Sequence, residues 1–276
     1  MNKSPSLRVR RNQGRAMNVE ANDTMFAEER KRKIIDLLKQ NKKVTVAELV
    51  HLFNVSSATV RSDLRELNDK GQIIRTHGGA IVETGASFEP DTEQKRDLNL
   101  AAKQQIARIA IELVNDGDTV IFDTGTTTLE LAKLLNQHRR VTAVTNDFEI
   151  ARVLEEMNSI NVLMLGGEIR KKFHCTVGAA GIDMLAQLTV DKVFMGTNSL
   201  SISKGASTPN IQQAETKKAM IASAKKVILL CSNNKLGKDS FVHFASLDQI
   251  DTLVIDQIDD NEKFEFEERG LEVLTG

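Results

Sequence analysis

The stretch TVIFDTGTTTLELAKLL, residues 119–135, decides the fold class of the larger part of the chain. It begins with an apolar run that ends at Asp123, Gly125 then permits a tight turn, and a helical pattern opens at Thr126. Five further apolar runs follow along the chain: VTAVTN (141–146), NVLMLGG (161–167), DKVFMG (191–196), KVILLCS (226–232) and DTLVID (251–256). Buried strands that alternate with helices indicate a mostly parallel sheet with helices on both faces. The sequence therefore predicts an α/β domain over residues 96–276.

Length and composition exclude several classes of protein. A chain of 276 residues with 41% hydrophobic residues can build a substantial core, which rules out a disordered chain or a collagen-like fibre. The two cysteines, Cys175 and Cys231, are far apart and indicate a reducing compartment rather than a disulfide scaffold. No run of about 18 apolar residues occurs, and no apolar stretch follows the basic N-terminal tail. We therefore expect a cytoplasmic protein with no membrane segment and no secretory signal.

The net charge of −1 conceals an uneven distribution along the chain. Residues 1–80 hold 16 Lys and Arg against 9 Asp and Glu, whereas residues 81–276 hold 21 against 29. A basic N-terminal part followed by an acidic remainder indicates that residues 1–80 alone bind a polyanionic partner. A solvated helical face with a loose cationic tail would give the same imbalance, so charge alone leaves both interpretations open.

The basic front has the pattern of a small helical domain. The expected order is a flexible basic arm over 1–25, the domain over 26–80, a linker over 81–95 and then a helix at about 92–115. Within the domain we expect helices over 27–40, over 46–53 and from Ser56 to Gly71, and a hairpin over 72–80. Three short helices and a basic hairpin are typical of a winged helix-turn-helix, in which one helix enters the major groove of DNA.

The third of these helices carries the candidate DNA contacts. It buries Val60, Leu64 and Leu67, which leaves its hydroxyl, methyl and guanidinium groups available for base edges. On the hairpin, Arg75 and His77 suit phosphate or minor-groove contacts. The contacts predicted on the helix are Ser57, Ala58, Thr59, Arg61, Ser62 and Arg65. The alternative interpretation is a helical dimerisation module with a solvated basic face.

Polar clusters follow the apolar runs of the α/β domain. The loop DTGTTT (123–128) offers free amides and hydroxyls at a helix start, which favour a phosphate or another anion. It is neither a Walker loop nor a dinucleotide G-x-G-x-x-G motif, and the alternative is an ordinary turn capped by threonines. Ligands bind at the carboxyl ends of parallel strands, so the clusters together predict a pocket for a hydroxylated, anionic metabolite. Lys235 would supply a point charge for phosphate. The predicted pocket residues are Asp123, Thr124, Gly125, Thr126, Thr127, Thr128, Thr145, Asn146, Gly166, Gly167, Thr197, Asn198 and Lys235.

The front of the chain resembles the DNA-binding domain of the DeoR family of bacterial transcription regulators. The resemblance spans residues 29–80 and rests on two motifs, VSSATVRSDL (55–64) and IIRTHGGA (73–80). One departure concerns the operator sequence rather than DNA binding itself. Ser62 follows Arg61 where the family usually has a second arginine.

The back of the chain resembles the C-terminal sensor domain of the same family. The matching motifs are DTGTTT, VTN, LGGEIRKKFHCTVG, FMGTNSLS, QAETKKAMI and NKLGKDSF. That domain is related in fold to ribose-phosphate isomerases and glucosamine-phosphate deaminases. The resemblance implies a repressor of a sugar or polyol catabolic operon, with a phosphorylated sugar or polyol as effector at the threonine loop. Two departures each lose an acid near the pocket, because the family often has Asp-Gly at Thr197-Asn198 and Asp-Ser-Ser-Lys at Ser232-Asn233-Asn234-Lys235.

Partners and chemistry follow from this interpretation. Two-fold operators need paired readers, so we expect a homo-oligomer, either a dimer or a tetramer, on double-stranded DNA. No cofactor is expected. No metal is expected either, since no further Cys or His lies at ligand spacing from His174-Cys175. Arg170-Lys171-Lys172 is expected to be solvated, and Glu215 with Lys218 to form a surface ion pair.

The alternative function is a sugar-phosphate isomerase or deaminase with an accessory DNA-binding module. Such an enzyme needs a proton-transferring pair, and Asp123 is the candidate base. The other strand ends offer hydroxyls and amides, which bind ligands well but transfer protons poorly. The sequence therefore favours the regulator, and no residue is predicted to be catalytic.

Overall fold

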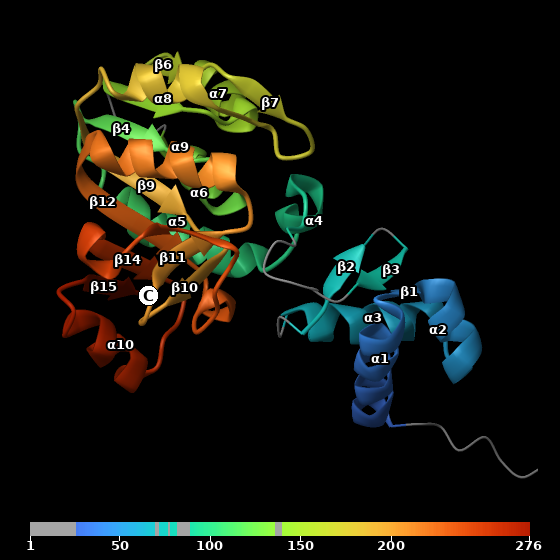
Figure 1. Ribbon diagram of the computed structural model, residues 1–276. Coiled ribbons are helices and arrows are strands. Elements are labelled where there is room, and N and C mark those ends of the chain that lie inside the picture. Colours follow the sequence, from blue (N-terminus) through green and yellow to red (C-terminus); the bar gives the residue numbers. More distant parts are fainter. Residues whose placement is uncertain (1–25, 70–71, 77, 82–88, 136–139) are drawn as a thin grey trace, which may run out of the picture.

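The computed structural model shows a small N-terminal unit and a larger C-terminal unit (Figure 1). It describes residues 26–69, 72–76, 78–81, 89–135 and 140–276. Three sequence predictions fall wholly or partly outside the described residues: the arm over 1–25, residues 82–88 of the linker over 81–95, and the roles of Gly71 and His77.

The N-terminal unit contains the three predicted helices and the predicted hairpin. Thr45 begins the second helix, because its hydroxyl accepts from the Glu48 amide at 3.2 Å while the Glu48 carboxylate accepts from the Thr45 amide at 2.7 Å. Asn54 ends that helix in the left-handed conformation, with φ of 51°. The short strand before it was not predicted; it pairs with the hairpin and gives a three-stranded sheet. The elements are α1 (Ala27–Asn41), β1 (Lys43–Thr45), α2 (Val46–Phe53), α3 (Ser57–Asp69), β2 (Ile74–Thr76) and β3 (Gly79–Ile81).

This unit has its own core and one buried ion pair. Ile34 and Leu38 of α1 pack against Val60 and Leu64 of α3, and all four side chains are buried. Beside them the Arg30 guanidinium of α1 donates to the Asp63 carboxylate of α3, with Nη2 to Oδ1 at 3.0 Å. The pair ties α3 to α1 and leaves the opposite face of α3 in solvent.

The C-terminal unit is the predicted α/β domain. All six apolar runs form strands of one seven-stranded parallel sheet, in the order β15-β14-β12-β9-β4-β5-β6. The strands are β4 (Thr119–Phe122), β5 (Val141–Thr145), β6 (Ile160–Met164), β9 (Val190–Gly196), β12 (Ala224–Cys231), β14 (Thr252–Ile255) and β15 (Glu272–Thr275). The helices are α4 (Thr92–Arg96), α5 (Leu100–Ile111), α6 (Thr126–Ala132), α7 (Phe148–Glu155), α8 (Ala179–Leu185), α9 (Ile211–Ala222) and α10 (Asp260–Glu267), with 3-10 turns η2 (Asn233–Lys235) and η3 (Leu247–Gln249).

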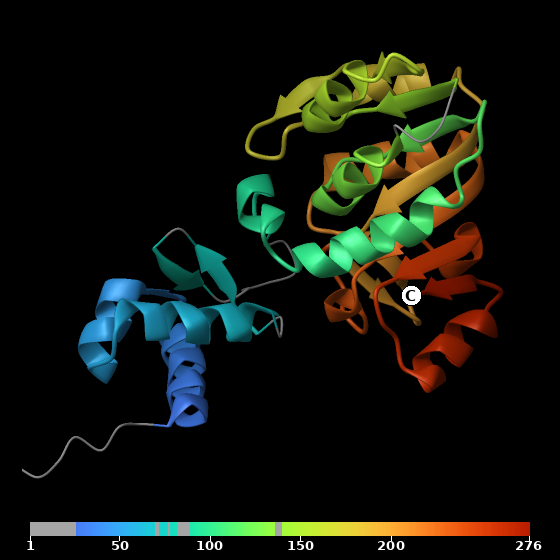
Figure 2. The same cartoon turned by 180° about the vertical axis from the view of Figure 1, so that it is seen from behind.

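Helices cover both faces of the sheet, as predicted for a parallel sheet. α5, α6 and α7 share one buried apolar cluster with the sheet, and α5 crosses that face in Figure 2. α8, α9 and α10 share the cluster on the other face, where α9 lies toward the viewer in Figure 1. The strand residues alternate between the two clusters, with Ile121 in one and Val120 and Phe122 in the other.

The prediction of one continuous helix over 92–115 is wrong, because the structure has two helices there. Asp91 caps a first short helix, α4, by accepting from the Gln94 amide at 2.9 Å. Asn99 then takes a left-handed conformation, with φ of 51°, and the chain turns into α5. The Lys103 ammonium on α5 donates back to the backbone carbonyls of Lys95 and Arg96 at the end of α4, so one side chain fixes the angle between the two helices.

Short antiparallel strands that the sequence did not reveal lie beside the main sheet. A three-stranded sheet has the order β10-β11-β13 and a hairpin pairs β7 with β8. These strands are only three or four residues long, which is too short for a periodic pattern. They are β7 (Glu168–Arg170), β8 (Cys175–Val177), β10 (Ser199–Ser201), β11 (Gly205–Thr208) and β13 (Val242–Ala245).

Candidate functional site

The N-terminal half of α3 presents an open polar face. Ser57, Ala58, Arg61 and Ser62 are exposed, and Thr59 is half-buried. The Ser56 hydroxyl begins the helix by accepting from the Thr59 amide at 3.1 Å, and Arg61 Nη1 lies 3.2 Å from Ser57 Oγ. The structure therefore groups these predicted DNA contacts on one free surface.

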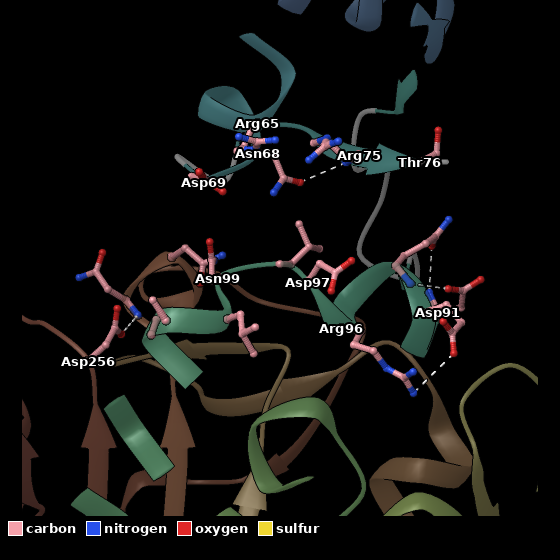
Figure 3. Close-up of a pocket in the computed structure, with 18 of the residues that line it drawn as sticks. Arg65, Asn68, Asp69, Arg75, Thr76, Asp91, Arg96, Asp97, Asn99 and Asp256 are labelled. Carbon is pink, nitrogen blue, oxygen red and sulfur yellow. Dashed lines mark hydrogen bonds and ion pairs between the residues drawn. The ribbon is translucent and has the colours of Figure 1, made fainter. Parts of the chain in front are cut away.

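The other two described DNA-contact candidates border a cleft between the two units. Arg65 of α3 and Arg75 of β2 line a cavity of about 1420 Å³ together with Asn68 and Asp69 (Figure 3). The opposite wall is built from the α4–α5 region, including Asp97 and Asn99, and from residues after β12 and β14. The backbone amide of Arg75 donates to Asn68 Oδ1 at 3.1 Å, which holds the hairpin against α3.

A second cavity, of about 170 Å³, lies at the carboxyl ends of β4, β9 and β12. Its volume suits a small metabolite. Asn68, Ile73 and Ile74 of the N-terminal unit also line it, so the cavity touches both units. The predicted pocket residues that the structure brings together here are Thr124, Gly125, Thr126, Thr127, Thr128, Thr197, Asn198 and Lys235.

The cavity is strongly cationic. Five lysines line it against one acidic side chain, Glu89, among the described residues. Burial, aided by neighbouring lysines, lowers the pKa of Lys103 to about 7, and burial lowers the pKa of Lys235 to about 8. Lys235 Nζ donates to the Thr197 carbonyl at 2.7 Å. Crowded, desolvated ammonium groups are stabilised by an anion, so this is the arrangement of an anion site. The five lysines are Lys95, Lys103, Lys217, Lys235 and Lys238.

Asp123 forms a buried ion pair with Lys217, one of the lysines that line the cavity. Its carboxylate, 1% exposed, accepts from the Lys217 ammonium of α9 and from the Gly196 amide, the latter at 2.9 Å. Lys217 also donates to the Gly196 carbonyl at 2.8 Å. Burial raises the pKa of Asp123, while the Lys217 ammonium and the amide hydrogen bond oppose that rise. A carboxylate held in this way is a structural clamp between β4, β9 and α9 and is not free to act as a base.

Besides Asp123, four predicted pocket residues do not line the cavity. Thr145 Oγ1 donates to the Phe122 carbonyl at 2.8 Å, and Asn146 Nδ2 donates to the Thr176 carbonyl at 2.7 Å. Gly167, with φ of 143°, lies against the carbonyl of Val177, where a side chain would not fit. Asn146 and Gly167 thus contact β8 of the hairpin, whereas Thr145 ties β5 to β4. The four that lie outside the lining are Thr145, Asn146, Gly166 and Gly167.

Sequence reasoning missed most of the charged lining. Lys103 sits on the same helical face as the buried residues Ile106, Ala107 and Ala110, and Lys217 shares a face with buried Met220. A lysine at a buried position of an amphipathic helix is the signal that could have identified both. Arg170 was expected to be solvated, but its side chain is only 14% exposed and pairs with Glu89 at 2.6 Å. By contrast, Glu215 and Lys218 form the expected exposed pair at 3.0 Å.

One group of side chains has the geometry of a weak cation site. Ligand atoms of Glu93, Glu149 and His174 all lie within 4.8 Å of one another. The Arg96 guanidinium already donates to both Glu149 oxygens at 2.6 Å, so a metal ion would have to displace it. Burial raises the pKa of the neighbouring Cys175 thiol to about 11, which makes it a poor ligand. None of the helices in the described residues has the length and apolar character needed to span a bilayer.

Comparisons with known proteins agree with both halves of this architecture. Residues 30–85 match the DeoR-like helix-turn-helix domain, and residues 98–257 match the DeoR C-terminal sensor domain. The HTH-type transcriptional regulator GlpR of Haloferax volcanii is 38% identical, over 91% of this chain and 99% of that protein. The HTH-type transcriptional repressor GlcR of Bacillus subtilis is 35% identical, over 91% of this chain and 97% of that protein.

One solved enzyme structure shows a distant likeness to this chain. Ribose 5-phosphate isomerase A of Methanocaldococcus jannaschii aligns with a TM-score of 0.38 and 19% identity. The alignment covers 50% of this chain, which spans about half (55%) of the isomerase's length. The two matched domains together cover most of this sequence. The chain belongs to the DeoR family of transcription regulators.

Proposed function

We propose that the protein represses a sugar or polyol catabolic operon and that a small phosphorylated sugar or polyol, bound in the 170 Å³ cavity, controls its affinity for the operator. The observation that carries the proposal is the lysine-lined cavity at the strand ends of a chain whose other unit is a winged helix-turn-helix. We infer repression rather than activation because the relative GlcR is named a repressor.

The chemistry of the cavity supports a phosphoester in particular. The lysines supply point charges for phosphate oxygens, and Thr126 and Thr127 line the same space. Within the described residues the hydroxyls of these two threonines have no hydrogen-bond partner of their own. Hydroxyls and amides beside a cationic end suit a ligand that carries both a phosphate and several hydroxyls.

The proposed DNA surface is the exposed start of α3 together with the hairpin. Arg61 can reach a guanine edge, and the short side chains of Ser57, Ala58 and Ser62 permit close approach. Because one recognition helix reads few base pairs, the proposal includes a homo-oligomer on a two-fold operator. It also places the protein in the cytoplasm, where prokaryotic DNA lies.

A mobility-shift titration tests the proposal directly. The full chain is mixed with the DNA that flanks its own gene, and a panel of phosphorylated sugars and polyols is added in turn. We expect a retarded complex at moderate salt that one member of the panel abolishes or strengthens. No retained DNA under any condition, or no response to any member of the panel, contradicts the proposal.

Lys235 gives a direct test of the anion site. Replacing Lys235 with methionine removes one ammonium from the cavity and is expected to weaken binding of inorganic phosphate about tenfold. Isothermal titration calorimetry measures the dissociation constant. Lys225→Met is the matched control, because Lys225 is exposed and pairs with Asp191 at 2.9 Å outside the cavity. Equal affinities of the Lys235 variant and the parent would remove Lys235 from the site.

The lowered lysine pKa values predict a pH dependence of effector binding. Lys103 and Lys235 lose their protons as the pH rises through about 7 and about 8, so the unliganded cavity loses positive charge over this range. A bound anion holds both protons on. Affinity for phosphate is therefore expected to fall at least about tenfold between pH 7.5 and pH 9, where phosphate itself stays mainly dianionic. Calorimetry across this range in one salt concentration measures it, and affinity that is flat or rises with pH contradicts the assignment.

A further inference from the structure

The cavity already contains an anion that belongs to the chain. Glu89 lies on the C-terminal side of residues 82–88 and its side chain is 5% exposed. Its carboxylate pairs with Lys95 Nζ at 2.6 Å through one oxygen and with Arg170 Nη2 at 2.6 Å through the other. Asn198 Nδ2 lies 3.3 Å from the first oxygen. One carboxylate thus joins the segment that leads out of the N-terminal unit to α4, β7 and the loop after β9.

This carboxylate is charged despite its burial. Burial on its own would raise the pKa of Glu89, but Lys95 and Arg170 lower it to about 2. Glu89 is also the one acidic side chain among the described residues that line the cavity, where it faces five lysines. It therefore neutralises part of the charge that an effector phosphate would meet.

The partners of Glu89 are groups that also bind phosphate oxygens. Arg170 is oriented by a second hydrogen bond, from Nη1 to Gln213 Oε1 at 2.6 Å, and its guanidinium lies 3.6 Å from the centre of the Phe173 ring. A planar guanidinium with an ammonium on the other side recognises two oxygens of a carboxylate or of a phosphate by the same geometry. The site is held in place by groups other than Glu89 itself.

We propose that Glu89 is a built-in competitor of the effector: an anionic ligand displaces its carboxylate from Lys95, Arg170 and Asn198. This rests on the proposed function of the cavity as a phosphoester site. The displacement explains how a small ligand acts on DNA binding. Ile81, the last residue of β3, is eight positions before Glu89, so release of the carboxylate detaches a residue close in sequence to the DNA-binding unit from α4, β7 and the loop after β9. The ligand then favours whichever arrangement leaves Glu89 free.

The test compares Glu89→Gln with the parent, using inorganic phosphate as the probe and calorimetry as the measurement. Glutamine keeps the shape of the side chain but removes its charge. If Glu89 competes with the ligand, the variant binds phosphate at least about tenfold more tightly, since an anion a few ångströms away no longer opposes binding. Glu93→Gln is the control: Glu93 is an exposed acid on α4 outside this cavity, and its variant should stay within about twofold of the parent.

A second measurement uses the unmodified chain and so does not depend on the variant folding. Hydrogen exchange of the backbone amides of Glu89 and of residues 91–96 is followed with and without phosphate. Displacement of Glu89 predicts faster exchange in this segment when phosphate is bound. Slower exchange there, or a Glu89→Gln variant that binds phosphate no more tightly than the parent, overturns the inference while leaving phosphate binding by the parent intact. Absence of phosphate and sugar-phosphate binding by both chains would instead remove the proposed function, and the inference with it.

Discussion

Replacing Lys217 with methionine is expected to lower the free energy of unfolding of the α/β domain by about 3–5 kcal/mol. The ammonium and the Asp123 carboxylate are 2% and 1% exposed, so the variant leaves a buried carboxylate without its counter-ion. The same ammonium also satisfies the Gly196 carbonyl at 2.8 Å. Urea unfolding followed by far-ultraviolet circular dichroism measures the change, since the chain has no Trp or Tyr for fluorescence.

The neighbouring residue supplies a matched control. Lys218→Met also removes one lysine from α9, but Lys218 pairs with Glu215 on the solvent face, and its loss should cost less than about 1 kcal/mol. The cost of Lys217→Met should also depend on pH. An unpaired, buried Asp123 has a raised pKa in the folded state, so the variant is stabilised at low pH and loses that stability as the pH rises. Similar losses for both variants, or no difference between pH 5 and pH 8, would show that the pair does not hold the domain together.

Arg61→Ala is expected to lower affinity for the operator about 10- to 100-fold and to relax base preference at one position of each half-site. Arg61 is exposed and its side chain has a hydrogen bond only to Ser57 among the described residues, so the fold of the N-terminal unit should not change. Fluorescence anisotropy with a labelled operator measures the affinity. Phosphate binding to the α/β domain should equal that of the parent.

Two further variants distinguish hydrogen bonding of Arg61 to a base from electrostatic attraction of its charge to DNA. Arg61→Lys keeps the positive charge but cannot form the paired hydrogen bonds that a guanidinium makes with guanine, so it should recover little of the lost affinity. Arg108→Ala removes an exposed arginine from α5 in the other domain and should leave DNA affinity within about twofold. Full recovery by lysine would mean that Arg61 contacts phosphate rather than a base.

The periodic parts of the fold could be predicted from the sequence because hydrophobic pattern encodes them. All six apolar runs became strands of the parallel sheet, and the N-terminal helices came within a residue or two of their predicted limits. The break at Asn99 was missed because Leu98, Ile106 and Ala110 continue one apolar face across it. β15 was missed because its alternating residues lie at the sheet edge and are partly exposed.

The candidate site could be predicted only in part, for a topological reason. Polar residues follow the predicted strands, but the hydrophobic pattern of the sequence does not reveal the order of those strands in the sheet. β12, β9 and β4 lie side by side in the middle of the sheet, so the loops after them converge on one cavity. β5 and β6 lie toward one edge, and the residues after them, such as Asn146 and Gly167, meet the β7–β8 hairpin instead. Lys235 follows β12 and was predicted, but Lys95, Lys103 and Lys217 come from helices and Glu89 from the linker, where no strand-end argument applies.

The order of the sheet also bears on how the protein is made. β4 pairs with β9 through residues 72 positions apart, such as Val120 and Lys192, and β9 must leave the ribosome before the middle of the sheet can close. The N-terminal unit needs only contacts within residues 26–81 and leaves the ribosome first. During synthesis, and in a chain that ends prematurely beyond residue 81, the DNA-binding unit is therefore expected to fold before the domain that controls it. Premature termination of translation should therefore yield DNA-binding units without a sensor domain more readily than sensor domains without a DNA-binding unit.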